Sequence, residues 1–306
     1  MGDLWWAWIP ITIMAAGLQT GRNAIQLHLT EQLGTIGATQ VRFLYGFPIA
    51  ATLTTFALLL TKSEIPKINY DFLLFITVGA FTQIFATSLM LGAMRYRAFV
   101  VVTALTKAEP IEVAIFGFII LNDQLPFLSV VAITIATAGV ILMAYNQPAN
   151  SSQRLSIYPI LMGLSSGAFF AIAAVSFRGA ILSLDGDNIV INASWSLSFC
   201  LAIQAISLCI WMYVFNRYEL IQTFKLWRIS FMGGLLGALA SKGWFLGFAL
   251  TAAANVRTLG LIEILFAQIL TRRIFLTRVS TRELVGISAI ILGVGVLLLN
   301  QGLGNS

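Results

Sequence analysis

The chain has 306 residues, of which 58% are hydrophobic and only 10% are charged, and its mean hydropathy is +0.90. A water-soluble domain carries about 25% charged residues, so this composition excludes an ordinary soluble fold. The net charge of +6 comes from bases scattered at the ends of apolar segments. That distribution is typical of helices anchored in a lipid bilayer, and it lacks the dense basic stripe of a nucleic-acid-binding protein.

Apolar segments of the length needed to cross about 30 Å of hydrocarbon follow one another along the whole chain. In chain order, the segments expected to form helices are 5–28, 36–60, 71–94, 98–121, 126–145, 157–178, 189–215, 228–250, 255–276 and 282–299. A polar linker at 146–156 separates the first five from the last five. The sequence therefore predicts an all-α, multi-pass integral membrane protein with ten transmembrane helices.

The two halves of the chain are expected to be a repeat. A shift of 155 residues lays Gly79 on Gly234, Gly92 on Gly247 and Thr103 on Thr258, in consistent order. Five helices per half is an odd number, so the second half must enter the membrane from the opposite side. The predicted arrangement is thus two inverted five-helix repeats, which in transporters place the binding site near the membrane midplane.

The strongest cluster of charges at membrane depth lies in the predicted helix 98–121. Its segment ALTKAEPIEVAIFG contains Lys107, Glu109 and Glu112, with Pro110 between the acids. Proline removes one backbone donor and crowds the carbonyl four residues earlier, here that of Thr106, so a kink is predicted. Ionisable residues inside a membrane are costly and by default indicate a functional site. We expect Glu112 to have a structural role.

The second half contributes charges at a similar depth. Glu263 lies in LGLIEILFAQIL, and the repeat shift brings it next to the positions of Lys107 and Glu109. Lys242 lies in ASKGWFLGF with Trp244, whose ring could stack on a planar solute but is of a type that usually packs in a core. Polar residues that could line the same cavity are Gln83 and Asn23. The candidate substrate- or ion-binding residues are Lys107, Glu109, Glu263, Lys242, Trp244, Gln83 and Asn23.

Two interpretations of these charges remain open. In the first, Glu109 or Glu263 binds a proton or a substrate amine, and a lysine serves as a counter-charge or carboxylate anchor. Burial favours the neutral carboxyl and a nearby cation favours the carboxylate, so the lysines decide whether an acid can carry protons near neutral pH. In the second, the charges form static ion pairs that hold the helices together. The lysines fit either interpretation, since a long side chain can also reach the interface.

Four arginines lie near the ends of predicted helices. Arg22 and Arg42 are a few turns from a helix end, and we expect them to anchor the membrane interface. Arg178 and Arg257 are expected in loops or at helix ends on one side of the membrane. The other side has more bases, which by the positive-inside rule places both termini outside.

Motifs of enzymes are not found. The sequence has no P-loop, dinucleotide fingerprint, nucleophile elbow or metal-ligand spacing, and its single histidine, His28, is expected at the surface. We therefore expect no enzymatic activity, no cofactor and no bound metal. Without a nucleotide site, gradient-driven or facilitated transport is favoured over an ATP-driven pump.

The chain resembles the drug/metabolite transporter (DMT) superfamily, specifically its ten-helix EamA-type members. The resemblance covers nearly the whole chain and rests on the repeat, on Arg42 in ATQVRFLYG, on the proline-centred segment ending in LNDQL, and on TRELVGISAIILGVGVLLL. Family members typically have Gly-Glu where this chain has Asn122 and Asp123. The resemblance implies EamA-like repeats at 1–148 and 149–306, with a cavity lined by the first, third and fourth helices of each half.

The function implied by this resemblance is secondary active transport, as an exporter of a small organic metabolite or amino-acid-like solute from the cell through the inner membrane. Coupling to protons or to exchange would use the membrane-embedded glutamates. The alternative is a non-transporting membrane protein, such as a lipid scramblase or an assembly partner, whose charges are structural. A monomer or homodimer is expected. Better-known members of the family have cytoplasmic termini, against the charge distribution, so the orientation stays open.

Overall fold

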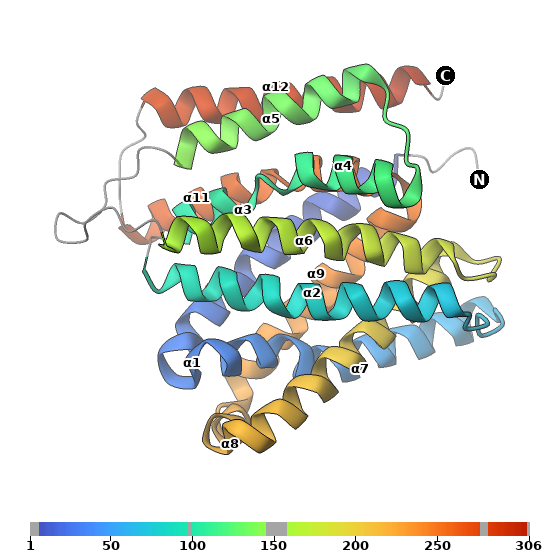
Figure 1. The fold of residues 1–306 in the computed structure, drawn as a ribbon, viewed down its shortest axis with the longest axis vertical. Helices are drawn as coiled ribbons and strands as arrows, with labels where there is room; N and C mark the ends of the chain where they lie inside the picture. The colour runs from blue at the N-terminus through green and yellow to red at the C-terminus, as the bar shows by residue number, and fades with distance from the viewer. Residues whose placement is uncertain (1–5, 97–98, 145–157, 276–280, 305–306) are drawn as a thin grey trace.

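The computed structural model describes residues 6–96, 99–144, 158–275 and 281–304, and every regular element in these ranges is a helix (Figure 1). The helices are α1 (Trp8–Thr61), α2 (Tyr70–Met94), α3 (Phe99–Thr106), α4 (Glu109–Leu121), α5 (Phe127–Ala144), α6 (Tyr158–Leu182), α7 (Ile189–Phe215), α8 (Arg217–Lys225), α9 (Trp227–Leu250), α10 (Ala253–Leu259), α11 (Ile262–Phe275) and α12 (Thr281–Gly304). The predicted all-α class is confirmed.

Helix α1 corrects the first predicted boundary. Residues 5–28 and 36–60 were expected as two helices with a loop between them, but α1 is helical over 54 residues with one non-helical position, Gly34. Gly34 has φ 65° and ψ 177°, a conformation open essentially to glycine alone. A Cβ there would also lie 2.5 Å from Oε1 of Glu219 in α8. One glycine therefore makes the bend that a loop was expected to make.

Two other predicted helices are each divided in two. Segment 98–121 forms α3 and α4, separated at Lys107 and Ala108, and segment 255–276 forms α10 and α11, separated at Gly260 and Leu261. The predicted kink before Pro110 is thus a turn of two residues, Lys107 and Ala108, that separates α3 from α4. The short helix α8 was expected to be loop; the side chain of Asn216 caps its start by accepting from the backbone N–H of Glu219.

Within the described residues, five helices are long and apolar enough to cross a membrane, namely α1, α2, α6, α7 and α9. The apolar parts of α5 and α12 are shorter. Many large apolar side chains point outward, for example Leu59, Phe118, Val214 and Leu299, each more than half exposed. A soluble monomer rarely exposes so much apolar surface, whereas hydrocarbon accommodates it. Ten separate crossings stay a prediction.

Helix pairs approach closely through small residues. Between α2 and α6 the contact is reciprocal: a Cβ on Gly79 would lie 2.5 Å from the ring of Phe177, and one on Gly179 would lie 2.9 Å from the ring of Phe75. Each glycine thus accepts a ring from the opposite helix. Association inside a membrane depends on such close packing, because lipid tails are as apolar as the side chains.

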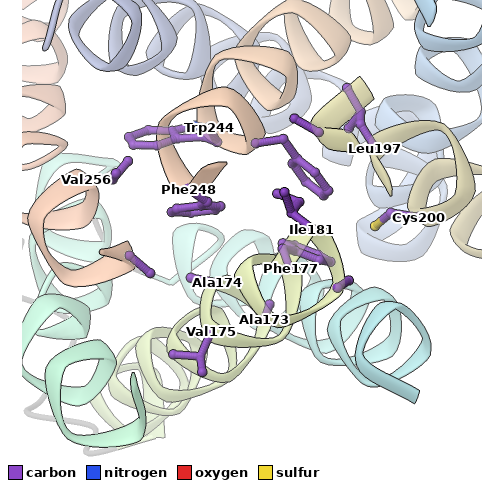
Figure 2. Close-up of a cluster of buried hydrophobic side chains, with 14 of the residues drawn as sticks. Ala173, Ala174, Val175, Phe177, Ile181, Leu197, Cys200, Trp244, Phe248 and Val256 are labelled. Carbon is purple, nitrogen blue, oxygen red and sulfur yellow. The ribbon is translucent and has the colours of Figure 1, made fainter. Parts of the chain in front are cut away.

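Aromatic and small apolar side chains form the core between α6, α7, α9 and α10 (Figure 2). The ring centroids of Phe177 and Phe245 are 4.7 Å apart, and those of Trp244 and Phe248 are 6.5 Å apart. This packing fixes one side of Trp244, and its indole N–H donates a hydrogen bond to Gln19.

Candidate functional site

The two broken helices supply the charges of the site. Pro110 cannot donate to the carbonyl of Thr106, and α3 ends at that residue. The second half has no proline at its break; there Gly260 allows Trp244 to approach, since a Cβ on Gly260 would lie 2.6 Å from the indole ring. Glu109 and Glu263 lie in the first turns of α4 and α11, and Arg257 in the last turn of α10. The partial charges of helix ends favour these signs at these places.

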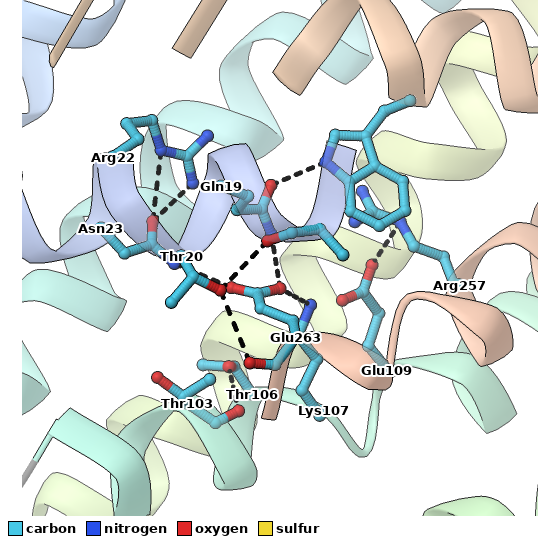
Figure 3. A network of polar contacts seen from close by, with 12 residues as sticks. Gln19, Thr20, Arg22, Asn23, Thr103, Thr106, Lys107, Glu109, Arg257 and Glu263 are labelled. Carbon is cyan, nitrogen blue, oxygen red and sulfur yellow. Dashed lines mark hydrogen bonds and ion pairs between the residues drawn. The ribbon is translucent and has the colours of Figure 1, made fainter. Parts of the chain in front are cut away.

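Glu263 is the centre of a buried network (Figure 3). Its Oε2 is 2.6 Å from Nζ of Lys107 and accepts a hydrogen bond of 2.8 Å from Nε2 of Gln19. Its Oε1 accepts a bond of 2.9 Å from Nδ2 of Asn23. Glu263 is 1% exposed and Lys107 5%. The carboxylate is thus fully solvated by protein groups, as a charge removed from water requires.

Glu109 and Arg257 form a second ion pair that crosses between the same broken helices. The distance from Nε of Arg257 to Oε1 of Glu109 is 2.8 Å, and both side chains are buried. The arginine also lies over the ring of Trp244, 4.7 Å from its centroid. We call Lys107, Glu109, Arg257 and Glu263 the ion-pair junction.

Trp244 connects the junction to the helix α1. Its Nε1–H donates a hydrogen bond of 2.8 Å to Oε1 of Gln19, whose amide in turn donates to Glu263. Nζ of Lys107 is 6.0 Å from the indole centroid. The ring therefore contacts both cations of the junction, a favourable arrangement for positive charge in a dry site.

Arg22 and Arg42 correct a prediction. They were expected at the membrane interface, but their exposed fractions are 1% and 2%, and both side chains point into the bundle. Arg22 donates to Oδ1 of Asn23, with 2.6 Å from Nη2. Arg42 reaches the hydroxyls of Thr87 and Ser241, each at 3.3 Å. The interface assignment failed because α1 continues through the expected loop, which puts both arginines deeper than the predicted helix ends implied.

A small central cavity lies beside the junction. Its volume is about 10 Å³, which is about the space of one water molecule. The residues that line it are Gln19, Arg42, Gln83, Phe170, Phe177, Ser241, Trp244, Phe245, Phe248 and Arg257. The cavity therefore has no room for an organic solute in this structure, and five aromatic rings are among the residues that line it.

The structure brings five of the seven predicted site residues together: Lys107, Glu109, Glu263, Trp244 and Asn23. Gln83 lines the central cavity and accepts a hydrogen bond of 2.9 Å from Nε2 of Gln204.

Lys242 is not in this group. It is half-buried, and its Nζ donates to the hydroxyl of Ser194 in α7.

The candidate set missed Arg22, Arg42 and Arg257, and it left out Gln19, which the sequence had indicated with Asn23 as a residue that could line a cavity. Arg257 was expected in a loop or at a helix end; it does lie in the last turn of α10, but that turn is buried and the side chain is only 5% exposed. A charge count was the available signal: helix 98–121 has two acids and one lysine, an excess of negative charge that favours a cation from another helix nearby.

Arg178 also has a different place from the one expected. Arg178 is a residue of α6, and its guanidinium pairs with Asp123, with 2.9 Å between Nε and Oδ2. Its Nη1 donates to the carbonyls of Phe248 and Thr251, each at 2.7 Å. Asp123 follows α4, and through Arg178 it joins the end of α4 to α6 and α9. His28 is exposed, as expected.

Comparisons with known proteins agree with this architecture. Residues 7–145 match the family model described as the EamA-like transporter family. A solved structure, titled only as a protein crystal structure, is similar over 98% of this chain and 99% of its own, with a TM-score of 0.70 and 14% identity. At that identity the likeness shows the fold alone. No curated protein matches the chain at a significant level.

Proposed function

We propose that this multi-pass membrane protein, whose residues 7–145 form an EamA-like transporter domain, is a secondary active transporter of a small organic solute. The observation that carries the proposal is the ion-pair junction, in which two buried ion pairs join the break of one helix to the break of another. Transporters place their sites where discontinuous helices meet near the membrane midplane.

The proposal includes two inverted repeats, 1–148 and 149–306, with ten crossings in total. If the two halves are related by a two-fold axis, the part of α1 before Gly34 corresponds to α6, and α9 corresponds to α2. The contact between α1 and α9 then becomes that between α6 and α2, and both contacts exist. Helices α5 and α12 would exchange with each other, and their contact is reciprocal: Gly139 meets Gly286, and Gly293 meets Ala132. These pairings support a two-fold relation.

Coupling in this proposal uses the acids of the junction. Glu263 and Glu109 each hold a cation now, and a proton or a solute that binds an acid would release that cation. Each pair connects the two halves of the chain. The loss of a pair would therefore destabilise the conformation that contains it relative to other conformations. Lys107, Asn23 and Trp244 would hold the acids in position, and Gln83 would contact the solute. Lys242 would lie outside the junction and would act through its hydrogen bond to Ser194 of α7.

The test is transport by purified protein in liposomes. A solute found in a thermal-shift screen of amino acids, amines, carboxylates and nucleosides is supplied under a pH gradient, and internal pH and solute are both followed. We expect Glu263→Gln and Glu109→Gln to abolish coupled transport, and Glu31→Gln, at an exposed acid of α1, to leave it unchanged. Full coupled transport in both junction variants would contradict the proposal.

The same variants separate transport from a purely structural role. If the pairs only hold helices together, the glutamine variants lower the unfolding temperature and the wild-type protein moves no solute. A lipid-scrambling assay on the same liposomes then tests the alternative directly. Export across the inner membrane, rather than an enzymatic activity, is the physiological role that we propose.

A further inference from the structure

Arg42 is a buried cation with no acid beside it. Its exposed fraction is 2%, its Nη atoms donate to two hydroxyls at 3.3 Å, its guanidinium lies 5.2 Å from the ring centroid of Phe43, and its Nε has no hydrogen-bond partner. Among the described residues, no carboxylate lies within ion-pair distance of it. Gly237 of α9 leaves the room for its stem: a Cβ there would lie 3.1 Å from Cγ of Arg42. A charge held in this way is costly unless something compensates it.

The surroundings have an excess of positive charge. The fully buried ionisable side chains of the described bundle include four cations, Arg22, Arg42, Lys107 and Arg257, but only two acids, Glu109 and Glu263. Both acids already have a cation, and Glu263 has two amide donors as well. Among the fully buried side chains, positive charges thus outnumber negative charges by two, and each acid of the junction already holds a cation. Glu112, next to Glu109 in the first turn of α4, is a further acid that is only half-buried.

The central cavity shows where a compensating anion would bind. Arg42 and Arg257 line it, together with the rings of Phe170, Phe177, Trp244, Phe245 and Phe248, and no acid is among its lining residues in the described chain. A guanidinium presents a planar pair of donors that matches a carboxylate. The rings provide an apolar surface for the rest of a ligand.

We propose that the solute of this site is an organic anion, whose carboxylate binds Arg42 and whose apolar or aromatic body lies among the rings of the central cavity. This inference rests on the proposed transport function and deepens it. The present cavity holds about one water molecule, so the solute binds when the surrounding helices separate. Zwitterions and amines are disfavoured because an amine would first have to displace the cation that each acid of the junction already holds.

The experiment uses three probes with the same ring and chain: 3-phenylpropanoate, 3-phenylpropanamide and 3-phenylpropylamine. Binding to the full-length purified protein is measured by thermal shift in dilute buffer, with sodium chloride alone as a fourth probe. The variants are Arg42→Gln, Arg42→Lys and the control Arg228→Gln, whose arginine is exposed on α9. Removal of an uncompensated cation is not expected to prevent folding, and Arg42→Lys keeps the charge without the planar donor pair.

We expect only the carboxylate to stabilise the wild-type protein. Its affinity should fall at least tenfold in Arg42→Gln, fall less in Arg42→Lys, and stay unchanged in Arg228→Gln. Equal binding of the amide or the amine, unchanged binding by Arg42→Gln, or a chloride shift that blocks the carboxylate would overturn the inference.

Transport of the same three probes in liposomes keeps the two proposals apart. If the amine or amide crosses in a Glu263-dependent way and the carboxylate does not, the transport function stands and the anion assignment falls. If the carboxylate binds at Arg42 but no solute crosses the bilayer, the binding site stands and the transport function falls.

Discussion

Two neighbouring regions of the bundle differ in whether their buried charges are compensated by a charge of opposite sign. In the ion-pair junction, each acid has a cation within 2.8 Å, and the charges sit at helix ends that favour them. In the central cavity, Arg42 has two hydroxyls at 3.3 Å and the ring of Phe43 beside it, but no acid. Trp244 contacts both regions. The comparison teaches that burial alone does not define a role: a compensated charge joins helices, and an uncompensated one favours a ligand of opposite sign.

The largest effect is expected from breaking one pair of the junction. Lys107→Met leaves Glu263 buried without a cation, so unfolding should become easier by about 3–5 kcal/mol. The double variant Lys107→Met/Glu263→Gln removes both charges and should regain much of that loss. Thermal unfolding in detergent measures both. Additive losses in the double variant would show that the pair does not act as a unit.

The contact between the regions is sensitive to Gly260. Gly260→Ala places a Cβ 2.6 Å from the ring of Trp244, and the ring must move because the core holds it. Overpacking of this kind costs about 3 kcal/mol at the upper end of its usual range. The control is Gly295→Ala, where no atom lies within 4 Å of the added Cβ. Equal unfolding temperatures for the two variants would contradict the role of Trp244 as the contact between the ion-pair junction and the central cavity.

A smaller effect is expected from the indole N–H alone. Trp244→Phe keeps an aromatic ring but removes the donor to Oε1 of Gln19, and the net loss of such a bond is about 1 kcal/mol. Trp211→Phe, at an exposed tryptophan, serves as the control for ring size. If the indole orients Gln19 on Glu263, coupled transport by Trp244→Phe should weaken more than its stability.

The smallest change in stability is expected at Arg42. Arg42→Met removes a cation that no acid compensates, so the free energy of unfolding should stay within about 1 kcal/mol of the wild-type value or rise. Arg257→Met, which leaves Glu109 unpaired, is the matched contrast and should be strongly destabilising. Equal destabilisation by the two substitutions would remove the distinction between the regions.

Much of the fold follows from the sequence, because apolar length and composition suffice to find helices in a membrane protein. Each of the ten predicted segments contains helix within the described residues, and two of them are divided into two helices. Boundaries were less accurate where the chain bends without a polar break. Gly34 turns α1 with no loop residues, and Gly260 divides α10 from α11 with no proline.

The site was predicted in part for the same reason. Depth in the membrane identified Lys107, Glu109 and Glu263, since an ionisable residue in the middle of an apolar segment is conspicuous. Arg22, Arg42 and Arg257 lie near the predicted helix ends, where arginine is ordinary, so only the real course of α1 and α10 shows that they are buried.

The sequence by itself determined that this chain is a membrane protein of apolar helices with charges in its middle, since composition and segment length carry that information locally. The tertiary structure alone decided the partners: Glu263 with Lys107, Glu109 with Arg257, and Arg42 with no acid at all. Ion pairing depends on atoms within a few ångströms across residues far apart in the chain, and no local pattern specifies that distance.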